Sequence, residues 1–311
     1  MKMRTERARD VPALQVVHTP AKINLWLEVL AKRPDGYHDL SSLMLPVALY
    51  DTLEVQIDPG DTQTRLEVNM PGVPTDERNL VWRAAQAYFQ RTSRPVGLRV
   101  RLTKRIPWAA GLGGGSSDAA AILSVLNQCA LDPLSPEELL GVAATVGADV
   151  PFFLLRRPAL ATGIGETLEP VDDLPSYPLV LIKPPVDVST AWAYGRLKLT
   201  RGGSRIRIAT LLACPRNPAP CLENDLEKEV VSRHPVIEGI KRWLLQNGAV
   251  GALMSGSGPT VFGVFEAWEQ AQAVESLAKR DRPEWWSAAV VTLTGREGVE
   301  SAHESWGVAK G

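Results

Sequence analysis

Hydrophobic and polar residues alternate in several stretches of the first hundred positions, and this alternation predicts β-strands. Between Lys22 and Leu30 every second residue is isoleucine, leucine or valine, so we expect a strand with one buried and one polar face. Pro34-Asp35-Gly36 predicts a turn after this strand. Further strand-like patterns cover residues 40–50, 53–57, 66–70 and 98–102.

Helical spacing of apolar residues begins near residue 80 and recurs through the rest of the chain. Segments 80–89 and 122–129 carry apolar residues at the helical period. Ser135-Pro136-Glu137-Glu138 combines a capping box with proline at the first helical position, so a helix should begin there and end at Gly147. In the second half we expect strands at 179–182, 261–265 and 288–293, and helices at 190–198, 222–232, 236–247 and 267–279.

Several strands precede the first helix, and this order predicts an α+β fold instead of a strictly alternating parallel sheet. The length of 311 residues favours two domains over one. Proline, glycine and acidic residues accumulate between 158 and 177. We therefore place the boundary in this stretch, with domains of residues 1–165 and 166–311.

The composition is that of a globular protein with almost no net charge. Hydrophobic residues make up 45% of the chain and charged residues 22%, and the formal net charge is −1. This balance excludes a disordered chain and provides no basic field for nucleic acid or an anionic membrane. No apolar run approaches the roughly 18 residues of a membrane helix, and the polar residues 1–10 do not resemble a signal peptide. These features predict a soluble, cytoplasmic protein without nucleic-acid or membrane partners.

Residues 111–115 (Gly-Leu-Gly-Gly-Gly) hold four glycines in five positions, directly before a predicted helix. Glycines let the backbone approach a ligand closely, and a helix N-terminus offers unpaired N–H groups with a partial positive charge. These features predict a phosphate-binding loop, although a flexible turn with a capping serine has the same ingredients. The loop lacks the Gly-Lys-Ser/Thr ending of a P-loop, and Ser116 stands in place of the third glycine of the dinucleotide fingerprint.

Residues 107–117 (Pro-Trp-Ala-Ala-Gly-Leu-Gly-Gly-Gly-Ser-Ser) resemble the glycine loop of the GHMP kinases, a family that includes galactokinase, homoserine kinase and mevalonate kinase. Residues 20–25 (Pro-Ala-Lys-Ile-Asn-Leu) and 255–262 (Ser-Gly-Ser-Gly-Pro-Thr-Val-Phe) match two further segments of that family. The resemblance implies a ribosomal-protein-S5-domain-2-like N-terminal domain, a ferredoxin-like C-terminal domain and an active site in the cleft between them. It also implies that ATP is bound by Pro107, Gly111, Leu112, Gly113, Gly114, Gly115, Ser116 and Ser117.

Within the family, residues 35–40 (Asp-Gly-Tyr-His-Asp-Leu) and 147–151 (Gly-Ala-Asp-Val-Pro) are similar to one branch. The resemblance implies transfer of the γ-phosphoryl group of ATP to the 2-hydroxyl of a methylerythritol unit linked to cytidine diphosphate, in the non-mevalonate route to isoprenoid precursors. By its neighbours alone, Asp149 is either desolvated for catalysis or a cap of the backbone. The resemblance makes Asp149 the general base, held ionised and oriented by Lys22.

The same resemblance implies the residues that bind the second substrate. Tyr37 stacks on the cytosine, His38 hydrogen-bonds the edge of the base, and Tyr194 covers its other face. From the sequence alone, Tyr37 and His38 have a second interpretation, as an amphipathic pair at the start of a strand. Five further residues complete the predicted substrate-binding set. Asn24 shares the polar face of its strand with Lys22, and Thr190 contacts the sugar or base. Gly256, Ser257 and Gly258 lie beside the diphosphate.

No metal-binding residue is predicted. Ser116 or Ser117 could serve as one Mg²⁺ ligand, but neither Asp118 nor the glutamates beyond Leu134 provide a clear second one. Mg²⁺ is therefore expected to arrive with ATP, held through phosphate oxygens and water. Cys129, Cys214 and Cys221 are interpreted as packing or loop residues.

Two other functions fit part of the pattern. One is another GHMP small-molecule kinase, such as homoserine or mevalonate kinase, and the other is a non-catalytic nucleotide-binding regulator. The Tyr37-His38 pair argues against the first alternative. The joint presence of Lys22 and Asp149 argues against the second.

Overall fold

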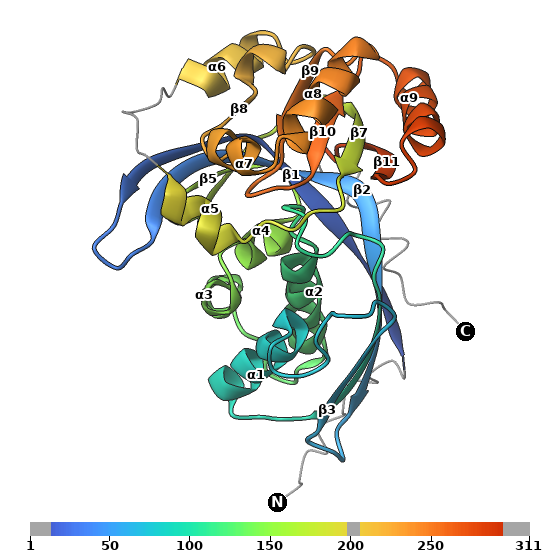
Figure 1. The fold of residues 1–311 in the computed structure, drawn as a ribbon. Helices are drawn as coiled ribbons and strands as arrows, with labels where there is room; N and C mark the ends of the chain where they lie inside the picture. The colour runs from blue at the N-terminus through green and yellow to red at the C-terminus, as the bar shows by residue number, and fades with distance from the viewer. Residues whose placement is uncertain (1–13, 198–205, 295–311) are drawn as a thin grey trace, which may run out of the picture.

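The computed structural model describes residues 14–197 and 206–294, which form two β-sheets with helices packed on them (Figure 1). The polar segment 1–10 and Lys198, the end of a predicted helix, lie outside these ranges. The first sheet contains β1 (Gln15–Lys32), β2 (His38–Asp58), β3 (Thr64–Val68), β4 (Gly97–Thr103), β5 (Ala159–Thr162), β6 (Thr167–Pro170) and β8 (Glu223–Asn224). The second contains β7 (Pro178–Lys183), β9 (Gly251–Met254), β10 (Val261–Val264) and β11 (Trp286–Val291).

The first sheet carries four helices of the N-terminal half: α1 (Leu80–Thr92), α2 (Gly114–Cys129), α3 (Pro136–Val146) and α4 (Val150–Leu155). Strands β3-β4-β2-β1-β8 follow one another across the sheet, and β5 pairs with both β2 and β6. Alternate residues of β2 and β4, among them Leu53 and Val100, pack against α1 and α2 in one core. As predicted, α3 begins with a capping box at Ser135, and Gly147 is its C-cap residue.

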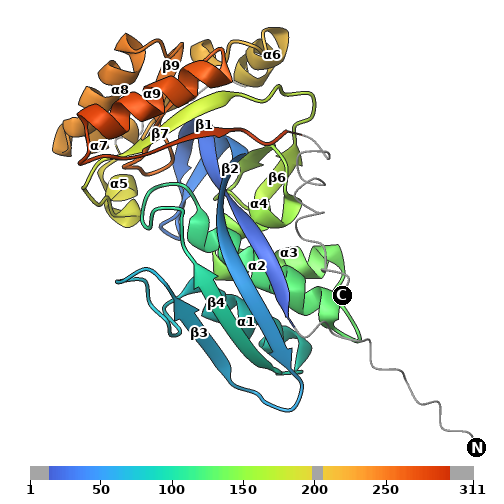
Figure 2. The same ribbon diagram turned by 90° about the vertical axis from the view of Figure 1, so that its right-hand side faces the viewer.

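The second sheet is antiparallel and has the order β11-β7-β10-β9. In chain order its strands and helices run βαββαβ, the split arrangement of a ferredoxin-like domain, as predicted. Its helices are α5 (Thr190–Arg196), α6 (Ile206–Ala213), α7 (Glu227–Arg233), α8 (Val236–Gln246) and α9 (Trp268–Asp281). Helix α8 packs on β9 and β10, and α9 packs on β7 and β11 (Figure 2).

Strands β1 and β2 are long enough to reach from one half of the molecule into the other (Figures 1 and 2). They pair antiparallel along almost their whole length, with register shifts that include one between Asn24 and Trp26. Backbone pairing also joins the halves: β8 pairs parallel with β1, and Thr292 bridges to Val47. A cleft between the halves is therefore framed by residues of the same two strands.

The structure corrects three sequence-based expectations. Strand β1 is buried on both faces from Ala21 to Val29, because the glycine loop and the second half of the molecule cover the face predicted to be polar. Residues 40–50 and 53–57 belong to one strand, β2. The helix expected at 222–232 begins only at Glu227, because residues 223–224 pair with β1 as β8. Helices α4 and α6 were not predicted.

The predicted domain boundary at 165/166 falls in the turn between β5 and β6. Both strands of this hairpin belong to the first sheet. We therefore propose that the boundary lies between Pro170 and Pro178, still inside the proline-rich stretch.

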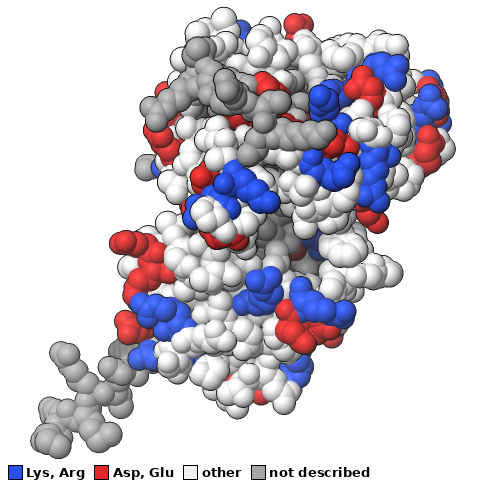
Figure 3. Space-filling view, turned by 60° about the vertical axis from the view of Figure 1, so that its left-hand side comes forward, with Lys and Arg blue, Asp and Glu red and all other residues white. Residues whose placement is uncertain are grey.

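Cys129, Cys214 and Cys221 form no disulfide with one another. Among the described residues, we find no helix with the length and hydrophobicity that crossing a lipid bilayer requires. On the face shown in Figure 3, lysine and arginine are interspersed with aspartate and glutamate.

Candidate active site

A cleft of about 980 Å³ lies between the two halves of the molecule. It brings together segments that are far apart in the sequence: β1, the 35–38 turn, the glycine loop, α5 and the 255–258 loop. Every residue predicted for the site lines this cleft except Ser117, namely Lys22, Asn24, Tyr37, His38, Pro107, Gly111, Leu112, Gly113, Gly114, Gly115, Ser116, Asp149, Thr190, Tyr194, Gly256, Ser257 and Gly258.

The glycine loop ends at Gly113, the N-cap residue of α2. Gly111 and Gly113 have φ values of 75° and 70°, in the left-handed region that other residues rarely adopt. A side chain at Gly111 would also meet the carbonyl oxygen of Ser255 at 2.2 Å. Helix α2 has no side-chain cap, so the first N–H groups of the helix remain available to a ligand. The loop and the start of α2 therefore form an anion-binding wall of the cleft.

Lys22 and Asp149 meet beside this wall. Their Nζ and Oδ2 atoms are 3.5 Å apart, and 5% of the lysine side chain and 32% of the aspartate side chain are exposed. Lys22 also donates a hydrogen bond of 2.6 Å to Asn24 Oδ1. The amide of Asn24 donates in turn to Ser42. The ammonium group is thus held between a strand partner and a carboxylate that remains open to the cleft.

The position of Asp149 fits neither of the two interpretations that its sequence neighbours allow. Asp149 is the N-cap residue of α4, yet its side chain accepts no capping hydrogen bond. A capping role is therefore excluded. The carboxylate is not deeply desolvated either, since about a third of the side chain is exposed. It is a solvent-accessible base candidate next to an ammonium group.

The far end of the cleft is aromatic. The rings of His38 and Tyr194 lie 5.5 Å apart, centroid to centroid, and 60% of Tyr37 is exposed. Burial lowers the pKa of His38 below 6.5, and Lys32 acts in the same direction. Burial, followed by the charge of Asp149, raises the pKa of Tyr194 far above its ordinary value. His38 and Tyr194 are therefore uncharged at neutral pH.

The second glycine loop, residues 255–258, packs directly against the first. Ser255 Oγ donates to the carbonyl oxygen of Gly111 at 3.1 Å, and the N–H of Thr260 donates to the carbonyl oxygen of Ala110. A Cβ atom at Gly256 would lie 3.3 Å from Lys22 Nζ. Ser257 is hydrogen-bonded to Thr190 across the cleft at 2.8 Å. The two loops, Lys22 and α5 thus form one continuous surface.

Ser117 differs from the other predicted site residues. Its side chain is buried and lines a separate small cavity together with Thr19, Phe152 and Arg156. Its backbone N–H already donates to the carbonyl oxygen of Gly113. The helical turn begun at Gly114 rotates Ser116 toward the cleft and Ser117 toward the interior.

Sequence reasoning missed the residues that hold the second loop. Asn224 donates from its side-chain amide to the carbonyl oxygens of Met254 and Gly256, both at 2.8 Å. Glu227 accepts from the N–H of Met254 and pairs with Lys241. Asn224 lies in the segment Asn224-Asp225-Leu226, and nothing in its local pattern shows that its side chain reaches a loop thirty residues later.

Two family models match the chain: GHMP kinases N terminal domain at residues 79–157, and GHMP kinases C terminal at residues 208–281. The two matches fall on the two halves that frame the cleft. The chain therefore belongs to the GHMP kinases, which use ATP as co-substrate. The predicted family, the two-domain α+β fold and the co-substrate are confirmed.

Within this family, the chain is similar to proteins named 4-diphosphocytidyl-2-C-methyl-D-erythritol kinase. One from Geobacter sulfurreducens is 44% identical over 274 residues, covering 88% of this chain and 97% of that protein. Another, from Syntrophotalea carbinolica, is 46% identical over 262 residues, covering 84% and 93%. A crystal structure of 4-(cytidine 5'-diphospho)-2C-methyl-D-erythritol kinase superposes with a TM-score of 0.76 at 36% identity, covering 89% of this chain and 99% of that one.

A homoserine kinase from Cytophaga hutchinsonii also shares the fold, with a TM-score of 0.71 over 93% of this chain and 98% of its own. It is only 19% identical. The similarity to this enzyme therefore concerns the fold alone.

Proposed function

We propose that this chain transfers the γ-phosphoryl group of ATP to the 2-hydroxyl of 4-diphosphocytidyl-2-C-methyl-D-erythritol, the substrate for which its relatives are named. The observation that carries the proposal is the Lys22–Asp149 pair, 3.5 Å apart beside a glycine loop in a cleft large enough for both substrates. The identity of 41–46% with relatives of that name favours this acceptor over homoserine or mevalonate.

In the proposed reaction, Asp149 accepts the proton of the 2-hydroxyl as its oxygen attacks the γ-phosphorus. The new O–P bond forms while the bond to the bridging oxygen breaks, and ADP leaves with that electron pair. Lys22 orients Asp149 through their 3.5 Å contact and opposes the negative charge on the transferred group. The geometry of the pair supports these roles, because the carboxylate of Asp149 is partly exposed and the ammonium group of Lys22 is hydrogen-bonded to Asn24.

ATP is proposed to place its phosphates on the N–H groups at the start of α2, at Gly114, Gly115 and Ser116, with Pro107, Gly111, Leu112 and Gly113 shaping the loop. Ser117 is left out of this contact set, because its N–H group is used within the helix and its side chain lines another cavity.

The cytidine end of the substrate is proposed to bind at the aromatic end of the cleft. Tyr37 and Tyr194 stack on the base, which is worth about 1–3 kcal/mol per base, and the neutral His38 hydrogen-bonds its edge. Thr190, Ser257 and the adjacent glycines 256 and 258 contact the sugar and diphosphate. The hydrogen bond between Thr190 and Ser257 supports a shared role for these two side chains.

Mg²⁺ is proposed to enter with ATP, where it would neutralise phosphate charge. Among the described residues, no group of three or more His, Cys, Asp or Glu side chains could hold a metal ion. Asp118, the carboxylate nearest to the loop in sequence, is already bonded to Lys104 and Thr19. The chain thus supplies a phosphate site, and the metal would be held through phosphate oxygens and water. A cytoplasmic location stays a prediction from the sequence.

The proposal is tested by measuring ADP release with three alcohols in parallel: the cytidyl diphosphate alcohol, homoserine and mevalonate. We expect turnover with the first and only background with the other two. Faster turnover of homoserine or mevalonate would assign the protein to another branch of the family. ADP release with none of the three would favour the non-catalytic alternative.

A further inference from the structure

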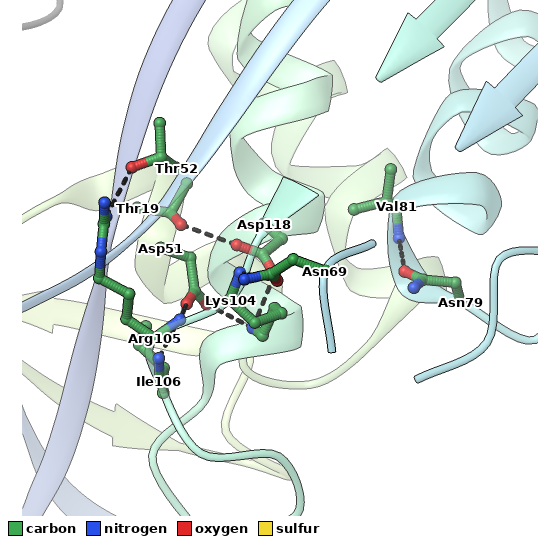
Figure 4. A network of polar contacts seen from close by, with 10 residues as sticks. All are labelled: Thr19, Asp51, Thr52, Asn69, Asn79, Val81, Lys104, Arg105, Ile106 and Asp118. Atoms are coloured by element: carbon green, nitrogen blue, oxygen red, sulfur yellow. Dashed lines mark hydrogen bonds and ion pairs between the residues drawn. The ribbon is translucent and has the colours of Figure 1, made fainter. Parts of the chain in front are cut away.

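A buried ionic network lies directly behind the glycine loop, outside the residues used in the proposed reaction (Figure 4). Lys104, which follows β4, pairs with Asp51 of β2 and donates to Asp118 of α2 at 2.9 Å. Thr19 of β1 donates to the other oxygen of Asp118 at 2.7 Å. These four side chains, which we name the loop anchor, are each at least 93% buried.

The loop anchor contacts the chain on both sides of the glycine loop. On the entry side, Asp51 accepts hydrogen bonds from the backbone N–H groups of Arg105 and Ile106, the two residues before Pro107. On the exit side, Asp118 lies in the first turns of α2, whose N-terminus forms the phosphate-facing wall. Lys104 bridges the two carboxylates. One ammonium group thus connects the two ends of the loop.

Lys104 also packs against the residue where the glycine loop enters α2, Gly114. A Cβ atom at Gly114 would lie 3.0 Å from Lys104 Nζ and 2.9 Å from Ile106, so the first residue of α2 rests on this lysine. Burial lowers the pKa of Lys104, but the two carboxylates outweigh burial and hold it above its ordinary value. The ammonium group therefore stays charged, and removing either partner would leave an uncompensated buried charge.

We infer that Lys104, Asp51 and Asp118 are positioning residues for ATP: they hold the glycine loop and the N-terminus of α2 at the spacing that the phosphates require. Because the amide groups of a preorganised loop bind phosphate without further ordering, loosening either end reduces nucleotide affinity. The cytidine end of the cleft does not touch the loop anchor and should be unaffected. This inference rests on the proposed placement of ATP at the glycine loop.

The test compares three variants of the full chain, Lys104→Met, Asp118→Asn and the triple variant Asp51→Asn/Lys104→Met/Asp118→Asn. ADP and ATP affinities are measured by calorimetry on protein that is folded by circular dichroism, and the KM of the cytidyl diphosphate alcohol is measured alongside. We expect Lys104→Met and Asp118→Asn to weaken ADP binding by about ten-fold or more, the scale of one lost charge-assisted hydrogen bond. The KM of the alcohol should stay unchanged. The triple variant removes all three charges of the loop anchor, so it can fold even if Lys104→Met does not, and it should show the same loss.

Two controls separate the possible outcomes. Leu126→Ala removes a buried side chain farther along α2, so it should lower the melting temperature without changing ADP affinity. Gly115→Asp places a negative charge at the exposed first turn of α2, where it suits the helix dipole but repels phosphate. If Gly115→Asp loses ADP binding while the folded anchor variants keep it, the inference is overturned and the ATP site stands. If Gly115→Asp keeps ADP binding, the proposed ATP placement itself fails.

Discussion

Lys22 shows how strongly the cleft depends on single residues. Its backbone N–H donates to the carbonyl oxygen of Leu112 at 2.9 Å, and its Nζ reaches Asn24 and Asp149. The resemblance to the GHMP kinases implied a role for Lys22, Asn24 and Asp149, because each lies in a short segment that matches the family. The orientation of Ser117 was not predictable in the same way, since one residue of helix phase decides whether a side chain faces the cleft or the core.

Replacing Asp149 by Asn tests the proposed general base. The amide cannot accept the proton of the hydroxyl, so kcat should fall by about 10²–10⁴-fold, while ADP affinity measured by calorimetry stays unchanged. Asp172→Asn, at an exposed aspartate paired with Arg157, is the matched control and should retain full activity. Wild-type turnover by Asp149→Asn would remove this residue from the mechanism.

His38 gives a prediction for pH dependence. Its pKa is lowered by burial, so the folded protein favours the neutral ring and the charge appears only as the pH falls through the lowered value. We expect kcat/KM for the cytidyl substrate to be flat at neutral pH and to decline only at a pH below 6.5, the ordinary pKa of histidine. The His38→Gln variant cannot titrate there and should decline less. Identical pH profiles for both proteins would exclude His38 as the titrating group.

At the scale of elements, β1 and α4 show where hydrophobic periodicity is sufficient to predict a strand or helix and where it is not. The alternation in 22–30 predicted a strand correctly, but the strand is buried on both faces, because partners from the second half cover its polar side. Helix α4 has six residues and contains Pro151 and two phenylalanines, a pattern too short to show a period. Such elements form through packing, since isolated short helices are marginal.

The second glycine loop is an element whose position depends on a remote side chain, Asn224. An Asn224→Leu substitution leaves the buried carbonyl oxygens of Met254 and Gly256 without their donor, at a cost of about 1–3 kcal/mol for each unsatisfied group. Steady-state kinetics should show a higher KM for the cytidyl substrate and little change for ATP. The exposed Asn217→Leu serves as the control. An unchanged KM in folded Asn224→Leu would place the loop outside the substrate site.

At the scale of the whole molecule, the two halves share a core. Ile23 of β1 and Leu45 of β2 lie in the same buried cluster as Leu181 of β7 and Phe262 of β10. The pairing of β8 with β1 and the bridge from Thr292 to Val47 add backbone contacts between the halves. A shared apolar core couples the stability of its parts, so the halves should unfold together.

Leu181→Ala tests this coupling. The side chain is fully buried, and its loss should destabilise the protein by about 2–5 kcal/mol. Calorimetry should show one transition that moves as a whole to lower temperature, in the wild type and in the variant. Two transitions, of which only one moves, would mean that the halves fold independently.

The sequence alone determined the local elements with a clear period or cap, the glycine-rich loops, and the residue types that their chemistry requires. These follow from short-range physics: hydrophobic periodicity, capping and the conformational freedom of glycine. Tertiary structure alone decided the burial of both faces of β1, the reach of Asn224 to the second loop and the joining of Lys104 to two carboxylates. These contacts are made between residues far apart in the chain, for example 67 positions between Asp51 and Asp118, and depend on how the two sheets pack. No local pattern encodes that packing.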